Sequence, residues 1–149
     1  MTNPRPRSAE RTDPDWVLLF AAWLIAALAT AGSLFFSYVM AFPPCVLCWY
    51  QRICLFPLVV ILARGLFPLD RGVVRYALPL VGLGWLVAAY HNLVYAGVVP
   101  ESLHPCSQGV SCTEEYIELL GFLSIPLLAL LAFTALAAVL IVLHRRSPP

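Results

Sequence analysis

Residues 16–39 read WVLLFAAWLIAALATAGSLFFSYV, a continuous apolar run without a charged side chain. A helix needs roughly 20 predominantly apolar residues to cross the hydrocarbon layer of a membrane, and this run is long enough. Three further apolar stretches lie at 49–67, 76–96 and 119–143. Because lipid offers backbone polar groups no water to bond to, we predict that all four stretches are helices.

The composition supports a membrane protein. The chain has 149 residues, of which 61% are hydrophobic and only 11% are charged, and its mean hydropathy is +0.85. These values lie far outside the usual composition of a soluble domain. We therefore predict an all-α membrane protein, a bundle of four transmembrane helices spanning 16–146. A mobile cytoplasmic tail at 1–15 and a second tail at 147–149 are expected to flank it.

The positive charges predict the orientation of the bundle. All nine basic residues are arginines, and eight of them lie before the first stretch, around the 68–75 link or after the fourth stretch. The positive-inside tendency therefore places both termini and this link in the cytoplasm. Segments 40–48 and 97–118 then face outward. A cleaved signal peptide is disfavoured, because the first run is long and shows no obvious small-x-small cleavage site at its end.

Two pairs of cysteines fall in the outward segments. Cys45 and Cys48 lie at the mouth of the second stretch, and Cys106 and Cys112 lie in the second outward loop. Disulfides persist outside the cytoplasm, so two structural bridges are one interpretation. However, a bridge between Cys45 and Cys48 would close a very short loop and add little stability.

The spacing of Cys45 and Cys48 has a chemical use at a helix start. The preceding Phe42-Pro43-Pro44 ends helical geometry, and free amide groups with the helix dipole favour a thiolate just after it. Zinc sites use the same spacing. A non-enzymatic module whose four cysteines bind zinc or copper is therefore the main rival, although the position at the membrane surface and the second pair favour redox chemistry.

Arg52 lies one helical turn beyond Cys48 and deeper in the membrane, where an ionised side chain is costly. One interpretation is that its long stem lets the charge reach the interface. The functional interpretation is a fixed cation that stabilises the Cys48 thiolate and polarises an oxygen of a lipid-soluble electron acceptor. The two interpretations are compatible.

The segment CVLCWYQR at 45–52 resembles the CxLCWYQR motif of the DsbB/BdbC family of bacterial disulfide-bond-formation proteins. The resemblance extends to 32–37, 105–112 and 121–126, and is to the BdbC-like branch with a short second loop. It implies a multi-pass thiol:quinone oxidoreductase of the bacterial inner membrane. Such a protein reoxidises a thioredoxin-like extracytoplasmic thiol oxidase and passes the electrons to membrane quinone, ubiquinone or menaquinone. The implied partners are this oxidase, lipid and quinone, with neither a metal nor a nucleic acid.

The resemblance also implies roles for individual residues. Cys106 and Cys112 correspond to the loop disulfide that meets the partner, and Cys106 is the site of attack. Cys45 and Cys48 correspond to the quinone-coupled pair, with Cys48 beside the ring. Arg52 corresponds to the quinone-proximal arginine of the family.

Three further residues have two interpretations each. His91 falls where the family places polar residues next to the quinone, but an interfacial histidine can simply be a hydrogen-bonded polar residue. Trp49 suits the wall of a quinone site, and with Tyr50 it equally suits an aromatic belt at the interface. Cys54 turns away from Cys48 along the helix, and we expect it to pack as a small hydrophobic residue.

The chain departs from the better-known proteobacterial members in its second outward loop, which is shorter and holds its cysteines six positions apart. An amphipathic loop helix on the membrane is therefore not predicted. A reductase that runs in the opposite direction, similar to vitamin K epoxide reductase, is a second rival. The CxxC of that family lies at its last catalytic helix, whereas here the motif precedes the second helix, which argues against this rival.

Overall fold

The computed structural model of this chain describes residues 13–100 and 124–146. Within these residues there are four helices and no strand: α1 (Pro14–Tyr38), α2 (Val46–Leu66), α3 (Val73–Tyr95) and α4 (Ile125–Arg146). Each helix is long and apolar enough to cross a membrane. The predicted fold class, an all-α bundle with four membrane spans, is confirmed.

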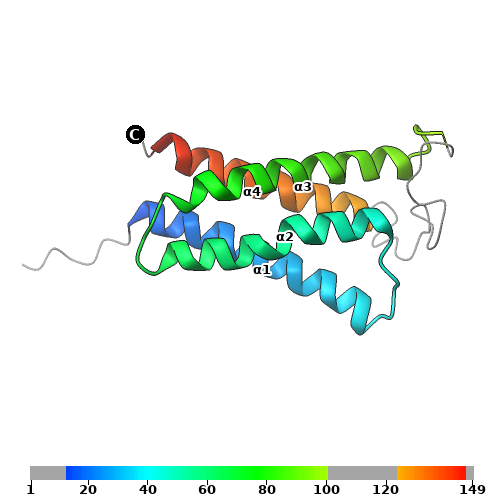
Figure 1. The fold of residues 1–149 in the computed structure, drawn as a ribbon, viewed down its shortest axis with the longest axis horizontal. Coiled ribbons are helices and arrows are strands. Elements are labelled where there is room, and N and C mark those ends of the chain that lie inside the picture. Colours follow the sequence, from blue (N-terminus) through cyan, green and yellow to red (C-terminus); the bar gives the residue numbers. More distant parts are fainter. Residues whose placement is uncertain (1–12, 101–123, 147–149) are drawn as a thin grey trace, which may run out of the picture.

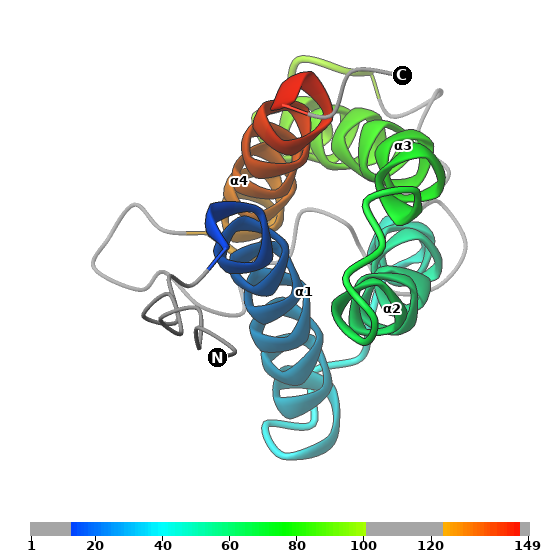
Figure 2. The ribbon, with the colours of Figure 1, turned by 90° about the vertical axis from the view of Figure 1, so that its left-hand side faces the viewer.

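The helices form a ring in chain order (Figures 1 and 2). α1 packs against α2 and α4, and α3 packs against the same two helices. In Figure 1 the start of α1, the α2–α3 link and the end of α4 lie at one end of the bundle, and the α1–α2 link and the end of α3 lie at the other. The predicted grouping of segments is therefore observed. Which end faces the cytoplasm stays a prediction.

The helix bounds differ from the predicted ones by a few residues. α1 begins at Pro14, two residues before the predicted start, because the Asp13 side chain accepts a hydrogen bond from the Asp15 amide and caps the helix. α2 begins at Val46, three residues early, since Cys45 caps it. α3 begins at Val73 and ends at Tyr95. α4 continues to Arg146, and the predicted start of the fourth stretch at 119 lies outside the described residues.

Small residues let the helices approach closely. Ala22, Ala26, Ala77 and Ala88 are fully buried, as is common where membrane helices pack without a hydrophobic driving force between them. At Gly84, a Cβ atom would clash with the ring of Phe133. Glycine is therefore required where α3 contacts α4.

A charged cluster joins three segments at the end that we predict to be cytoplasmic. The carboxylate of Asp15 lies 2.7 Å from the Arg71 guanidinium and 3.9 Å from that of Arg146. Asp15 is itself buried, with 6% of its surface exposed. The cluster connects the start of α1 to the α2–α3 link and to the end of α4, at the opposite end from the cysteines.

Candidate functional site

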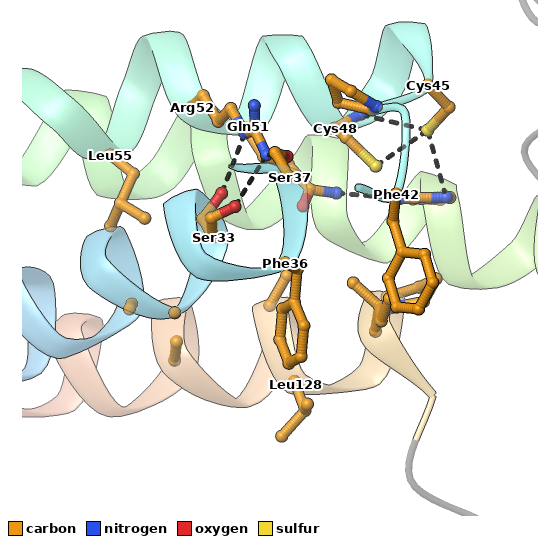
Figure 3. A pocket seen from close by; sticks show the side chains of 18 of the residues that line it. Ser33, Phe36, Ser37, Phe42, Cys45, Cys48, Gln51, Arg52, Leu55 and Leu128 are labelled. Carbon is orange, nitrogen blue, oxygen red and sulfur yellow. Dashed lines mark hydrogen bonds between the residues drawn. The ribbon is translucent and has the colours of Figure 1, made fainter. Parts of the chain in front are cut away.

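The two cysteines of the CxxC motif lie in contact at the start of α2. Their Sγ atoms are 2.9 Å apart, and both are free thiols (Figure 3). Cys45 is the N-cap residue of α2, and its sulfur accepts a hydrogen bond from the backbone N–H of Cys48 at 3.3 Å. The helix start therefore positions both sulfurs, as the sequence predicts.

Contacts with Cys48 and His91 lower the pKa of Cys45. The contact between the two sulfurs, in which either can donate, is the main reason why the pKa of Cys45 falls from 9.0 to about 4. Burial acts in the opposite direction, and hydrogen bonds from His91 and from the Cys48 amide lower the Cys45 pKa further. The Cys48 thiolate that the sequence predicts beside Arg52 stays a prediction.

His91 reaches this sulfur from α3. Its Nε2 atom lies 3.8 Å from Sγ of Cys45, and its Nδ1 atom lies 3.1 Å from the side-chain nitrogen of Gln51. Only 3% of the His91 surface and 7% of the Gln51 surface are exposed. Both ring nitrogens of His91 thus have partners on α2.

Arg52 is buried and bound to α1. Its Nε donates to the Ser33 hydroxyl at 2.8 Å, and its Nη2 donates to the Ser33 carbonyl oxygen at 2.9 Å and to the Ser37 hydroxyl. The guanidinium carbon lies 5.4 Å from the centre of the Trp49 ring. The charge is therefore held inside the bundle by α1 and does not extend to solvent.

These polar groups line one end of an apolar cavity of about 470 Å³. Cys45, Cys48, Gln51, Arg52 and His91 form this end, and the rest of the wall comes mainly from α1 and α4 (Figure 3). Representative apolar lining residues are Ile25, Leu28, Phe36, Leu55, Leu128 and Phe133. Leu28, which lies in the middle of α1, both lines the cavity and is 64% exposed, so the cavity is not sealed within the described residues.

Most of the predicted site residues in the described part of the chain meet in this cavity. Cys45, Cys48, Arg52 and His91 all line it. Trp49 is not among the lining residues, and half of its surface is exposed, so its observed contact is with the Arg52 guanidinium. Cys106 and Cys112 lie outside the described residues.

Cys54 lies outside the cavity, whereas three polar residues that the sequence did not indicate line it. Cys54 packs in the main apolar core and does not line the cavity, as we expected. Ser33, Ser37 and Gln51 were not identified as site residues from the sequence. The pattern held a signal for the serines, because two hydroxyls four residues apart in an apolar helix share one face.

The same geometry is compatible with a metal ion. The donor atoms of Cys45, Cys48 and His91 all lie within 4.8 Å of one another. Two sulfurs and an imidazole nitrogen are ligands that zinc accepts.

Comparisons with known proteins point to one family. The sequence profile described as "Disulfide bond formation protein DsbB" matches residues 14–143. This range contains all four helices almost completely. It also contains Cys106 and Cys112.

Individual relatives agree with the profile. A protein of Metapseudomonas resinovorans named "Probable disulfide formation protein" is 43% identical over 148 residues, which cover 99% of each chain. "Disulfide bond formation protein C" of Bacillus subtilis (strain 168) is 44% identical over 117 residues, which cover 78% of this chain and 85% of the relative. A "Probable disulfide formation protein" of Coxiella burnetii is 46% identical over 117 residues, covering 76% and 78% respectively. No solved structure matches this chain.

Proposed function

The chain belongs to the DsbB family of disulfide bond formation proteins, and from this premise we propose that it is a thiol:quinone oxidoreductase. Family and fold together make it a multi-pass protein of the bacterial inner membrane with an oxidoreductase role in disulfide formation. The proposal adds the electron donor and the electron acceptor. Electrons enter from a thioredoxin-like extracytoplasmic thiol oxidase, and they leave to membrane quinone.

The observation that carries the proposal is the position of the cysteine pair at the wall of an apolar cavity between membrane-spanning helices. Ligand sites are typically apolar clefts with a few convergent polar groups, and this cavity fits that description. A quinone ring has the same combination of a flat apolar body and polar oxygens, and its tail is soluble in lipid. The residues present therefore suit a membrane quinone.

Arg52 supplies the charge that such a ligand needs. A buried guanidinium with its hydrogen bonds to Ser33 and Ser37 cannot move freely, so it presents a fixed positive field to the cavity. Preorganised charge of this kind stabilises negative charge that develops during a reaction. When bound, quinone would supply the redox chemistry by accepting two electrons and two protons.

The proposed cycle starts in the second outward loop. A thiolate of the reduced partner attacks the Cys106–Cys112 disulfide at Cys106, and resolution releases the oxidised partner with a reduced loop pair. Thiol–disulfide exchange then passes two electrons from the loop pair to a Cys45–Cys48 disulfide. The reduced Cys45–Cys48 pair returns to the disulfide as its electrons leave through the cavity, with Cys48 as the cysteine next to the acceptor.

Quinol formation tests the proposal directly. Purified protein is mixed anaerobically with a reduced thioredoxin-like oxidase and a soluble quinone, and quinol is followed by absorbance. We expect one quinol for each oxidase disulfide formed. A Cys48→Ala variant is the matched control and should form none. A folded wild-type protein that oxidises no partner and forms no quinol would refute the proposal.

The rival metal function rests on the cluster of Cys45, Cys48 and His91. Elemental analysis of the same purified protein addresses it. One tightly held zinc or copper ion per chain that blocks alkylation of both cysteines would favour the metal module. Metal-free protein with full thiol reactivity would favour the redox centre.

A further inference from the structure

A buried chain of polar contacts runs from α2 to α3 and back to the cysteine pair. Gln51 on α2 contacts Nδ1 of His91 at 3.1 Å, and Nε2 of His91 faces Sγ of Cys45 at 3.8 Å. Gln51, His91 and Cys45 are 7%, 3% and 5% exposed. A buried amide and a buried imidazole are retained at low cost only when both are hydrogen-bonded.

The direction of these hydrogen bonds determines the tautomer of the imidazole. The atom of Gln51 that faces Nδ1 is the amide nitrogen, which can only donate. Nδ1 must therefore accept, and the hydrogen of the neutral ring then resides on Nε2. This hydrogen points at the Cys45 sulfur, so His91 donates to a thiolate at that position.

We propose that Gln51 is a positioning residue that fixes the His91 tautomer, so that His91 stabilises Cys45 as a thiolate each time this cysteine is released from a disulfide. The proposal deepens the proposed function, on which its catalytic meaning rests. It also gives His91 a task toward the thiol pair, in addition to its place in the cavity wall.

The chemical step needs no additional reactant. When a loop thiolate attacks a mixed disulfide that holds Cys45, a sulfur–sulfur bond forms in the loop and the bond to Cys45 breaks. The electron pair of the broken bond stays on Cys45, which leaves as a thiolate without a proton transfer. A leaving thiol with a lower pKa leaves faster, and the Nε2–H of His91 stabilises the charge that arises.

Within residues 13–100 and 124–146, other ionisable groups near this chain come from α2 and α3. Cys48 and Arg52 share the α2 face, and Tyr90 of α3 packs against the small cluster that contains Cys45. The cavity residues contributed by α1 and by the described part of α4 are serines and apolar side chains. Changes in Cys45 ionisation that follow substitution of Gln51 can therefore be attributed to a short set of neighbours.

Site-specific alkylation tests the proposal without any quinone. The fully reduced full-length protein is treated with iodoacetamide between pH 3 and pH 10, and modification of Cys45 is measured by peptide mass spectrometry. Gln51→Met keeps the side-chain volume but lacks the amide donor. It should move the Cys45 profile to higher pH and slow alkylation at pH 4 by about fivefold, the effect of one net hydrogen bond.

Three further variants and one double variant test whether Gln51 acts on Cys45 through His91. His91→Phe should cause at least the same slowing, and the Gln51→Met/His91→Phe double variant should be no slower than His91→Phe alone, because Gln51 acts through His91. Gln51→Glu should restore the wild-type profile, since a carboxylate favours an imidazolium that still carries a hydrogen on Nε2. Asn92→Leu, which removes the bond from Asn92 to the Pro126 carbonyl, is the control for general loosening and should leave the Cys45 profile unchanged.

If the factors by which Gln51→Met and His91→Phe slow Cys45 alkylation multiply in the double variant, the proposal is overturned. An Asn92→Leu shift of the Cys45 pH profile equal to that of Gln51→Met would also overturn it. Nitrogen NMR of histidine-labelled wild-type protein at pH 8 provides a measurement that needs no folded variant at Gln51, with the His91 signals assigned from His91→Phe. A hydrogen on Nδ1 would also overturn the proposal. Failure to form quinol with an intact Gln51 effect would instead refute only the proposed acceptor.

Discussion

Arg52 of α2 is bound to Ser33 of α1 by two hydrogen bonds, from Nε to the hydroxyl at 2.8 Å and from Nη2 to the backbone carbonyl at 2.9 Å. This pair joins two helices in the half of the bundle that holds the cysteines. It also means that the position of the buried charge depends on α1. Ser33 of α1 thus helps to fix the position of the Arg52 charge, and with it the electrostatic field in the cavity beside α2.

The Ser33→Ala/Ser37→Ala double variant is expected to weaken quinone reduction while leaving the partner reaction intact. Nε and Nη2 of Arg52 each lose a hydroxyl acceptor, and only the Nη2 bond to the Ser33 carbonyl remains, so the guanidinium is held less firmly. Stability should fall by about 1–3 kcal/mol, because hydrogen bonds to charged groups are among the stronger ones. Quinol formation should slow by about tenfold in stopped-flow absorbance. The control is Ser124→Ala, outside the cavity wall, which should retain the wild-type rate.

The pKa of Cys45 predicts a pH profile for the reduced protein. Because the Cys48 thiol is the main cause of the low value, Cys48→Ala should move the midpoint of Cys45 alkylation from about 4 toward the ordinary thiol value of 9.0. Cys54→Ala, a change in the core, should not move it. A low midpoint retained in Cys48→Ala would show that the cap and His91 suffice.

The same shift has a consequence for stability, with a defined sign. The folded-state pKa of Cys45 is lower than that of a free thiol, so folding releases a proton between these values. The contribution of Cys45 is therefore fully present above about pH 9 and is lost as the pH falls toward 4. The unfolding midpoint in urea, compared between wild type and Cys45→Ala at pH 8 and pH 4, measures this contribution. A difference that is independent of pH would contradict it.

Topology is tested by labelling in intact cells. In a background without other cysteines, a Val98→Cys variant should react with an impermeant maleimide from outside, because this exposed position follows the end of α3, opposite the arginine-rich link. An Arg75→Cys variant in the same background should react only after the cells are permeabilised. Labelling of Arg75→Cys in intact cells would reverse the predicted orientation.

The division of labour between the cysteine pairs predicts a trapped intermediate. Cys112→Ser removes the resolving thiol of the loop, so the partner should accumulate in a mixed disulfide with Cys106. Non-reducing electrophoresis detects the adduct, and mass spectrometry identifies the linked cysteine. An adduct that maps to Cys45 would show that the partner enters at the helix mouth instead.

The local parts of the site could be predicted from the sequence. Phe42-Pro43-Pro44 ends the α1–α2 link, and the spacing of Cys45 and Cys48 places both sulfurs at one helix start. Arg52 follows from the same helical periodicity. The four spans follow from apolar length alone, because the bilayer imposes that length.

Contacts between helices could not be predicted in the same way. His91 meets Cys45 and Gln51 only because α3 packs on α2 with a particular rotation, and apolar composition does not encode that rotation when lipid and core are equally hydrophobic. Trp49 shows the reverse case. It neighbours two site residues in the chain, but its half-exposed ring lies against Arg52 and does not line the cavity.

Arg52→Met separates the two interpretations of this arginine. Methionine keeps an apolar stem of similar length and removes the charge, so a residue that only anchors the helix would lose little. We expect instead that quinol formation falls by about 100-fold, the scale on which one preorganised electrostatic contact acts in catalysis. Attack of the partner on Cys106 should be almost unchanged, because that step takes place in the loop.

The formation of the mixed disulfide in Arg52→Met/Cys112→Ser measures the first step, and quinol absorbance in Arg52→Met measures the last. Because Ser33 and Ser37 hold the guanidinium, the loss in Ser33→Ala/Ser37→Ala should be smaller than the loss in Arg52→Met and should not add to it. Normal quinone reduction by a correctly inserted Arg52→Met protein would leave this arginine as a structural link between α1 and α2.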